Sequence, residues 1–120
     1  MRISIVTLFP EMFDGVLQTS MVGRAVCSEL VDINLVQLRD FAPDSRGTVD
    51  APPFGGGAGM VLQAGPLLKA VDSVSSNSSW NGKSHVILMS AQGMPLTHRR
   101  VVEFSMKEAI TIVCGHYEGV

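Results

Sequence analysis

The sequence has few cysteines and no paired metal-binding motif. Its two cysteines, Cys27 and Cys114, lie far apart, and neither belongs to a CxxC or a closely spaced Cys/His pattern. This spacing argues against a structural zinc site and against the disulfide framework of a small secreted domain. The three histidines are also scattered, so we predict no metal site. Because the cysteine usage fits a reducing compartment, we expect a cytoplasmic protein.

The sequence also lacks an excess of basic residues. Lys and Arg together number 9 against 11 Asp and Glu, which gives a formal net charge of -2 at pH 7. A protein that binds nucleic acid through bulk electrostatics should be basic. Any contact with RNA must therefore be local or come from other residues.

Long apolar runs are missing as well. None approaches the roughly 20 residues that a helix needs to cross a bilayer. The apolar residues 1–8 superficially resemble a signal peptide, but Pro10, Glu11 and Asp14 follow too soon and there is no small-residue cleavage site. We expect no association with membranes.

What remains is a chain well suited to a single α/β domain. It has 120 residues, of which 46% are hydrophobic and 17% are charged, so it can bury a core and is not disordered. Strand-like segments alternate with helical patterns, which predicts βαβ units and a mainly parallel sheet flanked by helices. We expect strands at 2–8, 31–38, 85–89 and 109–114, and helices after Pro10, from about 19 to 30, after Pro66 and over 97–107.

Two of these regions carry further predictions. Thr97 is a plausible N-cap for the last helix, in which Val101, Val102 and Phe104 are expected in the core. Residues 73–82, which include the only tryptophan, are polar and rich in serine, so we predict a surface loop there.

Residues 39–59 break the pattern, because they are rich in glycine and proline and show no apolar periodicity. We predict a long loop without regular structure, which is rare in compact domains and usually functional. Its glycines form neither a phosphate-binding motif, since no lysine follows before Lys69, nor a dinucleotide fingerprint, since no strand precedes them. They could lie against a large partner or a cofactor, or simply pack across the domain. Asp50 could orient this loop, contact a ligand or only cap a turn.

Two of the expected strands end in similar turns, Ser90-Ala91-Gln92-Gly93 and residues 114–119. Ligands of open α/β sheets bind outside the carboxyl ends of the strands, so neighbouring turns would form adjacent walls of one crevice. Main-chain groups with Leu88 and Tyr117 would suit a nucleoside. The alternative is that both are ordinary glycine-rich turns.

Charged residues near these features admit two interpretations. Glu118 is the only carboxylate next to the expected crevice, and we favour a binding or electrostatic role for it over that of a general base. Arg39, Asp40, Asp44 and Arg46 beside the glycine loop could contact phosphate or be solvated. The run His98-Arg99-Arg100 opposes the dipole at its helix N-terminus, which suggests an anion or a partner chain.

Several segments, taken in order, are similar to one known family. They are residues 8–13 (LFPEMF), 22–25 (VGRA), 53–60 (PFGGGAGM), 88–93 (LMSAQG) and 114–119 (CGHYEG). In these the chain resembles the bacterial tRNA (guanine-N1)-methyltransferases of the SPOUT class. The glycine loop and the final turn are the specific parts of the match.

The resemblance implies transfer of a methyl group from S-adenosylmethionine to N1 of the guanine immediately 3′ of the tRNA anticodon. It implies a homodimer and an α/β sheet whose C-terminal part forms a trefoil knot. The residues that it places in the cofactor cleft are Leu88, Ser90, Ala91, Gly93, Gly115, Tyr117, Glu118 and Gly119, with Glu118 also a candidate catalytic residue. Those that it places in a loop facing the cofactor and tRNA are Asp50, Phe54, Gly55, Gly56, Gly57 and Gly59.

The resemblance also has limits. Ala51, Ala91 and His116 stand where the family usually has an acidic residue, a proline and an arginine. Because family members are about twice as long, it implies that residues 1–120 are an incomplete N-terminal S-adenosylmethionine-binding domain, cut before the knot is complete. The expected base and the tRNA-binding domain would then lie further on, and this segment alone should be inactive. A non-catalytic dimerisation or RNA-binding remnant is the alternative.

Overall fold

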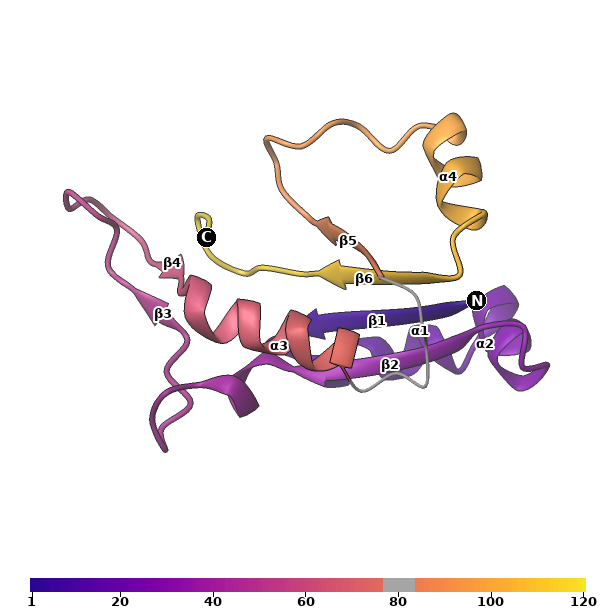
Figure 1. Ribbon diagram of the computed structural model, residues 1–120, viewed down its shortest axis with the longest axis horizontal. Helices are drawn as coiled ribbons and strands as arrows, with labels where there is room; N and C mark the ends of the chain where they lie inside the picture. The colour runs from indigo at the N-terminus through magenta and orange to yellow at the C-terminus, as the bar shows by residue number, and fades with distance from the viewer. Residues whose placement is uncertain (77–83) are drawn as a thin grey trace.

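The computed structural model describes residues 1–76 and 84–120. Its centre is a four-stranded sheet in the order β2-β1-β6-β5, in which every neighbouring pair is parallel (Figure 1). The mainly parallel sheet predicted from the sequence is confirmed. The strands are β1 (Arg2–Thr7), β2 (Asp32–Gln37), β5 (His85–Leu88) and β6 (Ala109–Val113).

The core lies between this sheet and α3 (Ala64–Ser76). The register sets Val6 of β1 opposite Val36 on one side and Val113 on the other. Because residues paired in register on neighbouring strands point to the same face of the sheet, these valines form one apolar row beneath α3. The buried residues packed there are Val6, Leu8, Leu38, Val49, Leu62, Leu67, Ala70 and Val113.

After β1 the chain forms η1 (Pro10–Phe13), α1 (Asp14–Leu17) and α2 (Ser20–Cys27). Thr19 occupies the N-cap position of α2, although its hydroxyl donates to Gly15 O instead of capping. The predicted extension of α2 to Leu30 is wrong. Glu29 adopts φ 56, and the N–H groups of Glu29 and Leu30 bond back to Val26 O and Ala25 O, which closes the helix end.

The region predicted to be structureless contains short elements. Leu38–Phe41 forms the 3-10 helix η2, and β3 (Asp50–Ala51) pairs antiparallel with β4 (Val61–Leu62). The glycine stretch is therefore the tip of a hairpin, which extends beyond the ends of β1 and β6 (Figure 1). Strands of two residues are too short to leave a periodic signal in the sequence.

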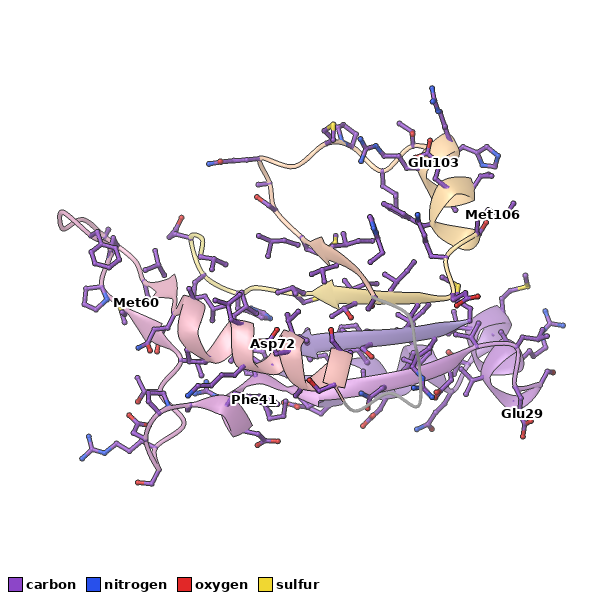
Figure 2. All side chains as sticks on the ribbon, viewed as in Figure 1. Glu29, Phe41, Met60, Asp72, Glu103 and Met106 are labelled. Atoms are coloured by element: carbon purple, nitrogen blue, oxygen red, sulfur yellow. The ribbon has the colours of Figure 1, made fainter. Side chains whose placement is uncertain are left out.

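The last helix, α4 (His98–Ser105), begins as predicted, because the Thr97 hydroxyl accepts the N–H of Arg100 at 3.4 Å. The prediction that Val101 and Val102 lie in the core is wrong, since they are 47% and 42% exposed. Only Phe104 is half-buried, against the ring of His85. The helix stands away from the sheet, and Met106 at its end points into solvent (Figure 2).

The helix α3 starts at Ala64, so Pro66 lies in its first turn, and it continues to Ser76. The first four residues of the predicted serine-rich loop, 73–76, are therefore helical, and the rest of that predicted loop, with Trp80, lies outside the described residues. Among the helices of residues 1–76 and 84–120, none has the length and apolar character needed to span a bilayer.

Candidate functional site

A cavity of about 720 Å³ opens at the carboxyl ends of β5 and β6. These strands are parallel neighbours with Leu88 opposite Val113, so the turns that follow them lie side by side. The two predicted walls therefore meet. The lining residues are Leu88, Met89, Ser90, Ala91, Gln92, Gly115, Tyr117, Glu118, Gly119 and Val120, which include every residue predicted for the cofactor cleft except Gly93.

The first wall is a tight turn after β5. Gly93 N donates to Ser90 O at 3.1 Å, and Gln92 N donates to the Ser90 hydroxyl at 3.2 Å. A Cβ on Gly93 would lie only 3.0 Å from Ser90 O, so a larger residue would crowd this turn. Gly93 itself lines a neighbouring apolar cavity of about 580 Å³ between β5, β6 and α4.

The second wall follows β6. Cys114 N donates to Val6 O at 2.9 Å, which extends the sheet to the cavity's edge. A Cβ on Gly115 or Gly119 would meet nothing within 4 Å. The missing side chains thus leave open space and bare main chain in the cavity. Burial raises the pKa of the Cys114 thiol, so this thiol stays neutral at pH 7 and is a poor nucleophile.

Tyr117 connects the cavity to the core. It packs against the buried cluster and lines the cavity as well. Burial, together with a hydrogen bond to Asp50 and that residue's charge, raises the pKa of Tyr117 above 10, although Arg39 opposes the shift. The phenol therefore remains protonated at neutral pH and can donate a hydrogen bond.

The hairpin β3–β4 is attached to this second wall. Leu62 N donates to Gly119 O at 2.8 Å, and Glu118 N donates to Met60 O at 3.1 Å. A Cβ on Gly59 would lie 2.8 Å from Cγ of Glu118, so the Glu118 side chain packs directly against the Gly59 backbone and occupies the space of a side chain there. This attachment left no signal in the sequence, because it joins segments far apart in the chain.

The structure therefore divides the residues predicted for the glycine loop. Asp50 and Gly59 lie at the base of the hairpin, against Tyr117 and Glu118. Phe54 is fully exposed at the tip, with Gly55, Gly56 and Gly57 beside it, where an added Cβ would meet nothing within 4 Å.

Two of the other charged candidates, Arg39 and Asp44, have structural partners for their side chains. Arg39 donates to Gly47 O at 3.0 Å, and the Asp44 carboxylate accepts the N–H groups of Arg46 and Thr48. These bonds hold the loop that leads to β3. No cluster of His, Cys, Asp and Glu suited to a metal ion occurs in the part of the chain that the structure describes.

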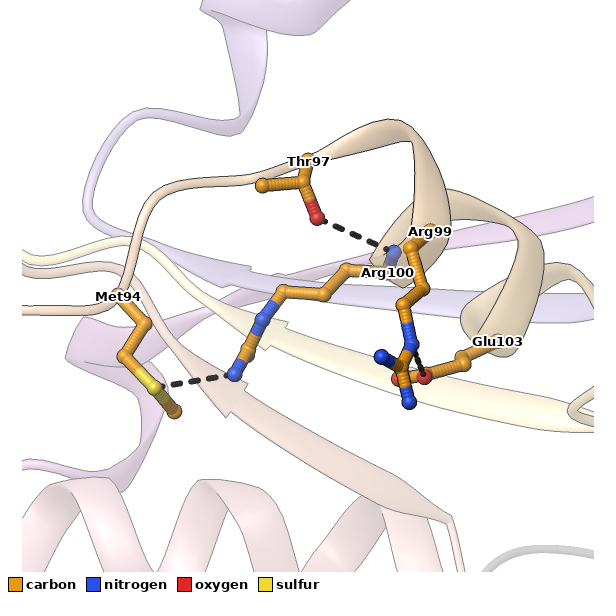
Figure 3. A network of polar contacts seen from close by, with 5 residues as sticks. All are labelled: Met94, Thr97, Arg99, Arg100 and Glu103. Atoms are coloured by element: carbon orange, nitrogen blue, oxygen red, sulfur yellow. Dashed lines mark hydrogen bonds and ion pairs between the residues drawn. The ribbon is translucent and has the colours of Figure 1, made fainter.

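The basic run on α4 is also partly engaged (Figure 3). Arg99 pairs with Glu103 at 3.2 Å, and Arg100 donates to the sulfur of Met94 at 3.0 Å. His116, from the second wall, packs edge-on against Phe9 with ring centroids 4.7 Å apart. Arg99, Arg100 and His116 do not line the cavity at the carboxyl ends of β5 and β6.

Comparison with known proteins identifies a family whose model and members match this chain. A family model described as tRNA (Guanine-1)-methyltransferase TrmD matches residues 1–120. A tRNA (guanine-N(1)-)-methyltransferase of Brevibacillus brevis is 47% identical over 119 residues, covering 99% of this chain and 47% of that protein. One of Syntrophomonas wolfei is 45% identical over 120 residues, covering 100% and 47%.

Solved structures give the same result. The crystal structure of tRNA (m1G37) methyltransferase from Aquifex aeolicus matches with a TM-score of 0.90 and 38% identity, covering 100% of this chain and 53% of that one. The chain spans about half the length of the curated relatives it matches. With its sequence, fold and cavity in agreement, the chain belongs to the TrmD family of tRNA (guanine-1)-methyltransferases.

Proposed function

We propose that residues 1–120 form the cofactor-binding part of an enzyme that methylates tRNA. The methyl group passes from S-adenosylmethionine to N1 of the guanine immediately 3′ of the anticodon. The observation that carries the proposal is the cavity formed by the two turns after β5 and β6. Because the chain spans about half of its relatives, the activity is proposed for the protein at its natural length.

The residues around the cavity fit an adenosyl group. Its volume of about 720 Å³ lies within the usual range of small-molecule sites, roughly 300–1,000 Å³. Gly115 and Gly119 leave main-chain groups accessible to the edge of a base, while Leu88 and Tyr117 offer apolar surface to its faces. We assign cofactor contacts to Leu88, Ser90, Ala91, Gly115, Tyr117, Glu118 and Gly119, with Gly93 shaping the turn.

Bound S-adenosylmethionine would supply a methyl group already activated by its sulfonium. The protein must then align the acceptor and handle a proton, because guanine N1 is protonated near neutral pH. Glu118 is the only carboxylate that lines this cavity among the described residues. Its negative charge favours a cationic ligand, and it is the residue to test for a part in the proton transfer.

The exposed hairpin tip suits contact with RNA. Phe54 lies fully in solvent beside Gly55, Gly56 and Gly57, and an exposed aromatic ring can stack on an unpaired base. We propose that this tip approaches the tRNA. We also propose that the protein acts in the cytoplasm.

We also propose a homodimer. Met12, Val16 and Met21 expose apolar side chains around η1, α1 and α2, which is typical of an interaction surface. Sedimentation equilibrium on the protein at its natural length tests this, and a monomer throughout the micromolar range would contradict it.

Calorimetry with S-adenosylhomocysteine tests the cofactor site. Gly115→Trp should weaken binding at least about tenfold, because an added Cβ there meets nothing within 4 Å and the large ring would take up space in the cavity that Gly115 lines. Gly65→Trp is a matched control, since an added Cβ there also meets nothing within 4 Å but lies on α3. No heat at millimolar ligand would favour the non-catalytic remnant.

Methyl transfer from labelled S-adenosylmethionine tests the reaction itself. Label should enter a tRNA with guanine 3′ of the anticodon and should not enter the same tRNA with adenine there. Glu118→Gln should lower the rate at least about tenfold if its charge acts in catalysis. Equal labelling of both tRNAs would contradict the proposed substrate.

A further inference from the structure

Tyr117–Gly119 takes part in two structures at once. On one side these residues line the cavity, and on the other they are attached to the hairpin that carries the glycine loop. We propose that this segment couples the two, so that an S-adenosyl compound in the cavity fixes the position of the glycine hairpin. The proposal rests on the proposed function, which supplies the occupant of the cavity.

The first link is made by the main chain. Glu118 N donates to Met60 O, and Leu62 N donates to Gly119 O, so residues 118–119 are hydrogen-bonded alongside the start of β4. Met60 is labelled on the hairpin in Figure 2. An isolated two-stranded hairpin is marginally stable at best, and here each strand has only two residues. The hairpin therefore depends on this segment for its position.

The second link is made by side chains at the hairpin base. Tyr117 lies against Asp50 and Arg39, and Arg39 donates to Gly47 O at 3.0 Å. Gln63, which follows β4, connects the two strands of the hairpin, because its side-chain amide donates to Asp50 O at 2.9 Å. Asp50 thus joins the start of β3 to the exit from β4, and its side chain acts on Tyr117, which lines the cavity.

The third link is steric. With a Cβ on Gly59 placed 2.8 Å from Cγ of Glu118, the Glu118 side chain rests directly on the hairpin backbone. A ligand that moves or holds the Glu118 side chain therefore also moves or holds the hairpin backbone at Gly59. Gly59 and Glu118 are both exposed, so this contact lies at the surface beside the cavity.

The coupling has a consequence for RNA. If the ligand fixes the hairpin, the exposed tip at Phe54 is positioned for tRNA only when the cavity is filled. Linkage is reciprocal, so tRNA must then raise the affinity for the cofactor by the same factor. Couplings of this kind typically amount to about 5–150-fold.

Hydrogen exchange on the protein at its natural length tests the coupling. S-adenosylhomocysteine should slow exchange of the Leu62 and Glu118 amides at least about fivefold. Gly59→Ala should remove most of this ligand-dependent slowing, since its Cβ displaces Glu118. Gly56→Ala is the matched control, because it has a similar φ (82 against 88) but no neighbour within 4 Å, and it should keep the slowing.

The outcomes separate the two proposals. If the ligand binds and the hairpin amides exchange at unchanged rates, the coupling is wrong and the cofactor site stands. If the ligand does not bind, both proposals are overturned. Asp50→Ala provides a second variant should Gly59→Ala fail to fold. It lies outside the cavity lining and should reduce the slowing while the ligand still binds, and full slowing in this variant would contradict the side-chain link.

Discussion

Asp44 shows how a single exposed carboxylate organises the loop before β3. Its Oδ1 accepts the N–H of Thr48 at 2.9 Å and that of Arg46 at 3.1 Å. These hydrogen bonds to the charged form, above all that from Thr48, lower the pKa of Asp44 below its ordinary value of 3.8. Because the folded-state pKa is depressed, the stabilisation is present above 3.8 and is lost as the pH falls through the folded-state pKa.

We therefore expect the Asp44 carboxyl carbon to titrate in NMR spectra with a midpoint below 3.8. The Thr48 amide should follow the same curve, since it donates to this group. In Asp44→Asn the Thr48 amide should lose that transition. A midpoint at or above 3.8 would show that the bonds do not form in solution.

Single residues also show what sequence reasoning can and cannot find at the site. Leu88 and Tyr117 could be placed in one crevice because Leu88 ends one strand and Tyr117 follows another, and parallel strands end at the same edge. The contacts of Asp50 with Tyr117 and of Gly59 with Glu118 could not be predicted, since they join distant segments. A glycine-rich stretch shows that other atoms can come close to its backbone, but it does not show which residue does so.

Among the elements, the long strands were predictable and the short or unusual ones were not. β1 and β6 are apolar and rich in β-branched residues, which is a strong local signal. The end of α2 was missed because Glu29 adopts the left-handed conformation that usually calls for glycine. The exposure of Val101 was missed because an amphipathic pattern does not say whether another element covers it.

The contact between α1 and α2 gives a prediction at this scale. A Cβ on Gly23 would lie 2.6 Å from the carbonyl carbon of Gln18, so Gly23→Ala must push backbone apart. We expect a loss of about 1–3 kcal/mol in the free energy of unfolding, as for other overpacked sites. Urea denaturation measures it.

Gly15→Ala is the matched control, because it is also helical and an added Cβ meets nothing within 4 Å. Relief of glycine's excess chain entropy should make it neutral or stabilising by up to about 1 kcal/mol. Equal losses in the two variants would mean that the close contact at Gly23 is not what the glycine serves.

For the whole molecule, the sequence predicted the sheet but not the order of its strands. β6 inserts between β1 and β5, so the first strand of the chain lies beside the last. Local patterns cannot specify this, because strand order depends on which crossovers the loops permit. The order matters for function, since it sets the turns after β5 and β6 side by side and so creates the cavity.

The same order places the core, which gives the last prediction. Leu38 is 1% exposed and packs with Val6 of the sheet and Leu67 of α3, so it joins the layers that hold the cavity's second wall. Leu38→Ala removes buried methyl groups and leaves a void, which typically costs about 2–5 kcal/mol. Leu30→Ala is the matched control, because Leu30 is 68% exposed and should change stability by less than about 0.5 kcal/mol. If urea unfolding gave similar small losses for both, the layer between the sheet and α3 would not be the core that stabilises this fold.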